Sequence, residues 1–445
     1  MNEILHRRNR VFHAIVLLGI AIVALALRLV YVRLAIVDHP LRGDAIQYFS
    51  YALNLVKHHT FSLALPNAQE VRPDSFRDPG YPAFLALVAS TLGSGETFYR
   101  AVLDLQCVFS TLTVAAFMIL GRRWMGIGAA VAIGCLLAIW PHLITECGYV
   151  LSETLLGVLV AAALLFLDTA LRKGHYGWYV AAGTAFALAG LTNAVVLPFG
   201  ALLGVVMLVL DGSRRKLWMA FALAAILPLG AWGLRGAFLP GADSSSDRAM
   251  MNLVQGSWPA YHTAYAGQLA GDPRSIATMH DIDAEYEAIH RDRRTGLMAL
   301  GARLAQDPAH TLGWYLSKPA HLWGWNIGIG QGDVYVFPTF NSPLLTNSLW
   351  RGLTNLLFLL NPIIMLLAAA GAVAAMFRTD ADPGLRIAAF LGAFVTGVFT
   401  LLQSDARYAT PYRGIEIAMT VYATALASCW IKMRNGQIRA HQTDI

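Results

Sequence analysis

Long apolar runs alternate with short polar segments along the chain, and this pattern predicts a membrane protein. Ten runs have the length and apolarity of membrane-spanning helices. The first continues from Val11 to Val37 after a basic start, so we expect a retained helix rather than a cleaved signal peptide. The predicted spans are 11–37, 98–120, 125–140, 150–170, 177–192, 194–210, 217–239, 352–377, 385–402 and 413–431.

Clusters of basic residues fall at alternate ends of successive runs, so all of them lie on one face of the membrane. Short loops rich in Lys and Arg face the cytoplasm. We therefore expect both termini inside a bacterial inner membrane and the long polar loops on the outer, periplasmic side. The clusters are Arg7/Arg8/Arg10, Arg122/Arg123, Arg172/Lys173, Arg214/Arg215/Lys216, Arg378/Arg386 and Lys432/Arg434/Arg439.

The outer segments contain shorter patterns of their own. Residues 81–92 are apolar but too few to span, which favours an interfacial or re-entrant helix. Residues 281–306 mix apolar and charged positions at helical spacing and predict amphipathic helices on the outer surface. The aromatic-rich stretch 312–340 is either another interfacial segment or an eleventh span.

This pattern divides the chain into three parts. The first is an N-terminal membrane module, whose outer loops 38–97 and 141–153 carry the candidate chemistry. An outer, amphipathic region follows, and then C-terminal membrane helices with a short cytoplasmic tail. The ranges of the three parts are 1–239, 240–351 and 352–445.

Composition agrees with lipid as the solvent of this all-α bundle of ten or eleven spans. The 445 residues are 56% hydrophobic and only 13% charged, and the mean hydropathy is +0.52. An ordinary soluble domain carries about 25% charged residues. The net charge of +6 does not indicate a nucleic-acid partner, because much of it lies in the short loop clusters. The four cysteines show no zinc or disulfide spacing.

Acids and arginines gather where predicted helices meet the outer water. Asp44 follows the first span, Arg77 closes the first outer loop, Glu153 begins a later span and Arg407 precedes the last one. Ionisable groups near a membrane are functional candidates. Taken singly, Asp44 could be a helix N-cap, Glu153 an acid facing a helix dipole, and each arginine an interfacial snorkelling residue.

Five motifs in order resemble those of the membrane-embedded GT-C glycosyltransferases, in the branch of the protein O-mannosyltransferases and the lipid A aminoarabinose transferase. The resemblance covers the membrane core from about residue 10 to 430 and is weak in the loop 240–351, which would choose the acceptor. The chain departs from the mannosyltransferases in having one acid rather than two after the first span. The motifs are Asp44, Arg77–Pro82, Gly121–Arg123, Ser152–Thr154 and Arg407–Pro411.

The resemblance implies a GT-C-like bundle and a sugar donor carried on polyprenyl phosphate. It implies that Asp44 is the base for an acceptor hydroxyl on a lipid A, glycan or other acceptor, with inversion at the sugar. Glu153 could then position the acceptor, support Asp44 or help hold a divalent cation. No cofactor is required, although two carboxylates could hold a divalent cation. Donor-phosphate candidates are Arg77, Lys57, Arg72, Arg235 and Arg407, and substrate-positioning candidates are Tyr48, Tyr81, Glu146 and Tyr408.

Two other classes of protein share this substrate chemistry. A transporter or flippase for lipid-linked sugars would use the same apolar groove, but it is expected to carry ionisable or helix-breaking residues deep in several mid-chain spans. The predicted spans from 125 to 210 are almost free of charge. A polymerase or ligase of surface polysaccharide differs only in its acceptor.

Overall fold

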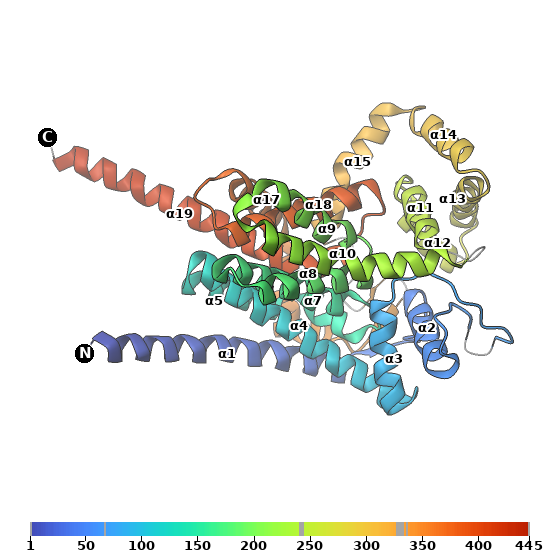
Figure 1. Cartoon of the computed structure of the whole chain (residues 1–445), viewed down its shortest axis with the longest axis horizontal. Helices are drawn as coiled ribbons and strands as arrows, with labels where there is room; N and C mark the ends of the chain where they lie inside the picture. Colours follow the sequence, from blue (N-terminus) through green and yellow to red (C-terminus); the bar gives the residue numbers. More distant parts are fainter. Residues whose placement is uncertain (1, 66–67, 240–243, 326–332, 335–336, 444–445) are drawn as a thin grey trace.

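The structure, a computed structural model, describes residues 2–65, 68–239, 244–325, 333–334 and 337–443. Long helices run side by side, and the start of α1 and the end of α19 project from the same end of the bundle (Figure 1). The first half of the chain forms α1 (Asn2–Leu34), α2 (Asp44–His58), α3 (Gly80–Leu92), α4 (Glu96–Met125), α5 (Ile127–Ile139), α6 (Pro141–Thr145), η1 (Glu146–Gly148), α7 (Glu153–Lys173), α8 (Tyr176–Thr192), α9 (Leu197–Leu210), η2 (Gly212–Arg214) and α10 (Arg215–Ala237).

The second half begins with short helices that lie at the opposite end of the bundle from the termini, as do α2 and α3 (Figure 1). The remaining long helices then return to the bundle. These elements are α11 (Ser245–Gly256), α12 (Tyr261–Leu269), α13 (Pro273–Arg291), α14 (Arg293–Leu304), α15 (Pro308–Trp323), α16 (Pro343–Thr346), α17 (Ser348–Phe377), α18 (Pro383–Leu401), η3 (Ala406–Tyr412) and α19 (Arg413–Thr443).

The expectation of a helical, polytopic membrane protein is confirmed, although the spans differ in detail from the ten predicted. Among the described residues seven helices are long and apolar enough to cross a membrane, or eight if the bent pair α5–α6 is one span. Two further predicted spans form the shorter helices α8 and α9, of 17 and 14 residues. Residues 312–340 add no such helix among those described, because α15 ends at Trp323.

The two outer patterns are confirmed as helices. The short apolar run is α3, and the amphipathic segment is α13 and α14. A small antiparallel sheet was not predicted: β3 (Phe337–Phe340) pairs on one side with β1 (Ile36–Val37) and on the other with β2 (Asp333–Val334). Ile36 lies opposite Phe340, so the sheet ties the C-terminal end of α1 to the segment before α16.

The predicted span 125–140 breaks at Trp140, and a buried arginine explains how the break is tolerated. The guanidinium of Arg28 in α1 donates to the carbonyl oxygens of Leu137 and Ala138 at 3.1 Å each, and to Ser110 Oγ at 2.7 Å. These carbonyls lose their helical partners where α5 ends, and buried carbonyls need donors. The bend between the two helical pieces is 59°.

At the end of the bundle near the termini, one acid joins three predicted cytoplasmic loops. Asp168 is 2% exposed and accepts from Arg123 at 2.8 Å and from Arg172 at 3.0 Å. Arg172 also pairs with Asp382, at the start of α18, at 2.6 Å. Because a buried carboxylate requires such partners, this cluster fixes the relative position of α4, α7 and α18.

Candidate active site

Asp44 begins α2 without capping it, so the N-cap interpretation is wrong. Gly43 holds the N-cap position with a positive φ of 55°, and no side chain caps the helix. The carboxylate of Asp44 turns instead to two arginines. Its Oδ1 accepts from Arg77 Nη2 at 2.6 Å, and its Oδ2 accepts from Arg407 Nη2 at 2.7 Å.

Arg407 joins the two acids predicted as catalytic. Its Nε lies 3.0 Å from Glu153 Oε1 while its Nη2 binds Asp44. It sits in η3, which begins where the side chain of Asp405 accepts the backbone N–H of Arg407 at 2.8 Å. Its side chain is only 7% exposed, so it is a buried bridge rather than a snorkelling residue.

Arg77 is fixed on three sides. Besides Asp44, its Nε donates to Gln47 Oε1 at 2.6 Å, and its guanidinium lies 5.2 Å from the ring centre of Tyr48. Gln47 is three residues after Asp44 in α2, and residues at this spacing share one helix face. The start of α2 therefore supplies both partners of Arg77 and the ring on which it rests.

Exposure orders the carboxylates from the surface inward. The side chain of Asp44 is 26% exposed and that of Glu153 is 9% exposed, whereas Glu146 is 1% exposed as a residue. Burial raises the pKa of Asp44, but Arg77 and Arg407 outweigh it and hold that pKa well below its usual range. Asp44 is thus an ionised carboxylate that faces the outside of the site.

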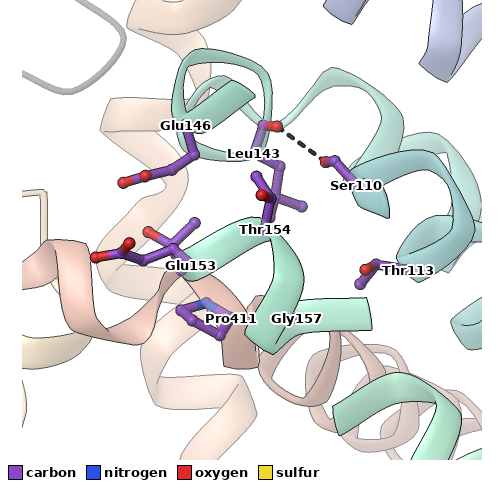
Figure 2. A pocket seen from close by; sticks show the side chains of 9 residues that line it. Ser110, Thr113, Leu143, Glu146, Glu153, Thr154, Gly157 and Pro411 are labelled. Carbon is purple, nitrogen blue, oxygen red and sulfur yellow. Dashed lines mark hydrogen bonds between the residues drawn. The ribbon is translucent and has the colours of Figure 1, made fainter. Parts of the chain in front are cut away.

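A narrow cavity lies behind this group, between η1, α7 and η3. Glu146 and Glu153 point toward the same side of it, and Thr154 and Pro411 also contribute to its walls (Figure 2). Its room is about that of one water molecule. The cavity brings Glu146 to the rear of the predicted catalytic acids.

Of the predicted positioning tyrosines, Tyr48 and Tyr81 are buried beside the site and Tyr408 is partly buried. The rings of Tyr48 and Tyr81 meet edge to face with centroids 5.1 Å apart. Tyr81 donates to Gln106 Oε1 at 2.7 Å, while Tyr408 donates to Gln403 Oε1 at 2.7 Å. Burial raises the pKa of Tyr48 and Tyr81, so both keep neutral hydroxyls.

Three predicted phosphate ligands lie outside this cluster. Lys57 is exposed near the far end of α2, and Arg72 is exposed and pairs with Glu70 at 2.7 Å. Arg235 donates to the carbonyl oxygen of Asp74 at 2.8 Å and stacks 4.7 Å from the ring centre of Trp232. In this arrangement Arg235 holds the first outer loop against α10.

Helix α12 contributes residues that sequence reasoning missed. Tyr265 packs against the hydrophobic cluster that contains Tyr48 and Tyr81. Burial raises the pKa of both Tyr261 and Tyr265, and the negative charge of Asp44 raises it further. The two tyrosines are four residues apart and share a helix face. Their i, i+4 spacing was the only available signal, and the sequence gives no hint that this face meets Asp44. Among the described residues, no group of three His, Cys, Asp or Glu is placed to hold a metal ion.

Comparison with known proteins gives a likeness of fold. No protein-family model matches the chain, and no curated protein matches it by sequence. The archaeal oligosaccharyltransferase AglB from Archaeoglobus fulgidus, in complex with an inhibitory peptide and a dolichol-phosphate, is similar at a TM-score of 0.52 and 16% identity. That match covers 97% of this chain and 52% of the AglB chain.

A second structure of the Archaeoglobus fulgidus oligosaccharyltransferase, in complex with Zn and sulfate, is similar at a TM-score of 0.51 and 16% identity, over 94% of this chain and 50% of that one. ArnT from Cupriavidus metallidurans bound to undecaprenyl phosphate is 16% identical over 94% of this chain and 77% of that one, at a TM-score of 0.35. The chain spans about half the length of the oligosaccharyltransferase. The expected GT-C-like architecture is therefore confirmed as a likeness of fold, and the chain is a polytopic helical membrane protein whose fold is similar to that of the oligosaccharyltransferase.

Proposed function

We propose that the chain is an inverting glycosyltransferase that moves a sugar from a polyprenyl-phosphate carrier to a lipid, glycan or other acceptor at the outer face of the membrane. The observation that carries the proposal is the pairing of one partly exposed carboxylate, Asp44, with two arginines from segments far apart in the chain. This set lies at the end of the bundle opposite the termini.

The two arginines suit a phosphate. In the proposed reaction, the bond between the anomeric carbon and the phosphate oxygen breaks, and polyprenyl phosphate leaves with the electron pair. Guanidinium groups bind phosphate oxygens strongly and stabilise the charge that develops on them. Arg77 is 12% exposed and borders the more exposed Asp44, so we assign it the main contact. The dolichol-phosphate held by the AglB structure supports a lipid phosphate as the ligand.

The acceptor hydroxyl attacks the anomeric carbon from the side opposite the phosphate, which inverts that carbon. Its proton goes to Asp44 and then to the outer solvent. Both oxygens of Asp44 bind arginines in the structure, and an ion-paired carboxylate of low pKa is a weak base. A donor phosphate that draws Arg77 away releases Oδ1, so phosphate binding itself activates the base.

Helix α12 provides the wall that faces the acceptor. Asp44 contributes to the raised pKa of both Tyr261 and Tyr265, so the two tyrosines of this helix lie within electrostatic range of the carboxylate. Aromatic faces with a hydroxyl at the edge suit sugars and other partly polar molecules. The identity of the acceptor therefore depends on the region where the family resemblance is weakest.

Labelled sugar separates this function from transport. Purified protein in liposomes is given a polyprenyl-phosphate sugar labelled in the sugar, together with an extract of lipid and glycan acceptors. Transfer of the label to an acceptor, with release of unlabelled polyprenyl phosphate, is the expected result. Label that crosses the bilayer still attached to its carrier would show a flippase instead.

A further inference from the structure

The inner carboxyl of the site, Glu146, makes no hydrogen bond to the part of the chain that the structure describes. Neither Oε1 nor Oε2 has a partner, and the residue is 1% exposed. It lines the narrow cavity together with Glu153 (Figure 2). Buried carboxyls are normally paired or hydrogen-bonded, so this arrangement requires an explanation.

The charges of the site balance without Glu146. Asp44 and Glu153 supply two negative charges, and Arg77 and Arg407 supply two positive ones, in direct contact. A third carboxylate at 1% exposure would be an unpaired buried charge, which is strongly unfavourable. Charge balance therefore requires a neutral, protonated Glu146.

The other charged and titratable groups that face Glu146 do not change this balance. These are Glu153 on α7, Arg407 and Asp405 at η3, Cys147 on its own turn, and Tyr81 of α3, whose hydroxyl is neutral. The carboxylate of Asp405 lies 3.5 Å from His262 of α12 and accepts the backbone N–H of Arg407. It therefore adds a negative neighbour rather than a cation for Glu146.

Glu153 has a carboxylate oxygen that could accept a hydrogen bond from a protonated Glu146. Its Oε1 meets Arg407 at 3.0 Å, while its Oε2 is buried without a partner. The hydroxyls of Thr154 and Thr410 also line the cavity and lack partners among the described residues. Such polar walls, with room for about one water, suit a bridging water molecule.

We propose that Glu146 is a protonated positioning residue that donates a hydrogen bond to Oε2 of Glu153, directly or through one water in the cavity. The hydrogen bond keeps Glu153 ionised and in contact with Arg407. Arg407 in turn holds Asp44, the proposed base, at 2.7 Å. This inference rests on the proposed function, because it assigns Glu146 a role in orienting that base.

Two substitutions on the same cavity give opposite expectations. Glu146→Gln keeps a hydrogen-bond donor of the same shape, so its transfer rate should stay within about threefold of the wild type. Glu153→Gln removes the anion that binds Arg407 and should lose at least tenfold, the usual size of a charged hydrogen bond. Glu146→Leu, which has no donor, should also lose about tenfold.

Two further measurements separate this role from a merely structural one. In infrared difference spectra, Glu146→Gln should remove a protonated-carboxyl C=O band that Glu153→Gln retains. If the band is still present in Glu146→Gln, or is absent from the wild type, the proposal is overturned. The wild-type rate should fall at alkaline pH as Glu146 ionises, whereas the rate of Glu146→Gln should not show that fall.

Other outcomes would contradict the inference in distinct ways. A Glu146→Gln protein as inactive as Glu153→Gln would show an ionised Glu146 that acts as a base or holds a cation. A Glu146→Leu protein with wild-type rate and pH profile would show that the carboxyl has no role. The infrared band can be measured without substrate. If the wild-type protein transfers no sugar, the proposed function is refuted, but the spectra still test whether Glu146 is protonated.

Discussion

Replacing Asp44 by Asn tests the proposed base most directly. The amide cannot accept the acceptor proton at neutral pH, and general-base catalysis contributes about 10²–10⁴-fold. We therefore expect the transfer rate to fall by that factor, which corresponds to a barrier increase of about 2.7–5.5 kcal/mol. The protein should still insert and fold.

The structure limits the accompanying loss of stability. After Asp44→Asn, Arg77 keeps its bond to Gln47 at 2.6 Å and Arg407 keeps Glu153 at 3.0 Å. The new amide oxygen still accepts from one guanidinium. The loss should therefore be about 1.5–3 kcal/mol, the range for one hydrogen bond to a charged group.

The pH dependence of that loss follows from the lowered pKa of Asp44. A carboxyl whose folded pKa lies below its unfolded value of 3.8 stabilises the protein above the unfolded pKa, and the effect disappears only as the pH falls through the folded one. Between pH 5 and 8 Asp44 is ionised in both states. The difference in melting temperature between wild type and variant should be constant over that range.

The assay measures initial rates of sugar transfer and melting temperatures on proteins purified in the same detergent. Asp104→Asn is the matched control, because Asp104 pairs with Arg33 at 2.8 Å on the outside of the helices with both side chains at least 40% exposed. Its rate should equal that of the wild type. An Asp44→Asn protein that melts normally and transfers sugar within threefold of the wild type would refute Asp44 as the base.

Three further predictions follow from individual side chains. Arg77→Ala should raise the apparent KM for the lipid-phosphate donor about tenfold or more, whereas the exposed Arg100→Ala should not; an unchanged donor KM would exclude the phosphate role. Arg28→Met removes the donors of the α5 break and should lower the melting temperature by several degrees, while the exposed Arg33→Met should not. Burial lowers the pKa of Lys318 from 10.5 to about 8, so the unfolded chain binds more protons between these values and stability rises with pH there. The melting temperature of wild type relative to Lys318→Met should rise from pH 8 to 10.5; a flat difference would show that the buried amine keeps its ordinary pKa.

Much of the fold could be predicted because its signals are local. An apolar run of about 20 residues specifies a span by its own composition, and a basic cluster marks its end. The predicted loop clusters of Arg123 and Arg172 do meet, at Asp168. The break at Trp140 was missed because it depends on Arg28, which is more than a hundred residues away and acts through α5 carbonyls.

The site was predictable in part for a similar reason. Asp44, Arg77, Glu153 and Arg407 all lie at or near the starts of helices, and the predicted topology puts these starts on one face, so the four residues could be expected near one another. Residue type alone does not give the direction of a side chain. Arg235 has the same side chain as Arg77, yet backbone carbonyls of the first loop and a tryptophan ring contact its guanidinium.

The closed ion-pair cluster constrains the order of events in the proposed reaction. Both oxygens of Asp44 are occupied by guanidinium groups, so an acceptor that arrives first meets a carboxylate with little remaining basicity. Arg407 cannot easily move away from Asp44, because its side chain is only 7% exposed and is also paired with Glu153. Among the residues that the structure describes, the neutral Gln47 is the other side-chain hydrogen-bond partner of Arg77. The anionic phosphodiester of the donor competes well for this guanidinium, and the phosphate gains a second negative charge as it leaves. The donor must therefore bind first, and the charge that it brings both occupies Arg77 and frees the oxygen that removes the acceptor proton.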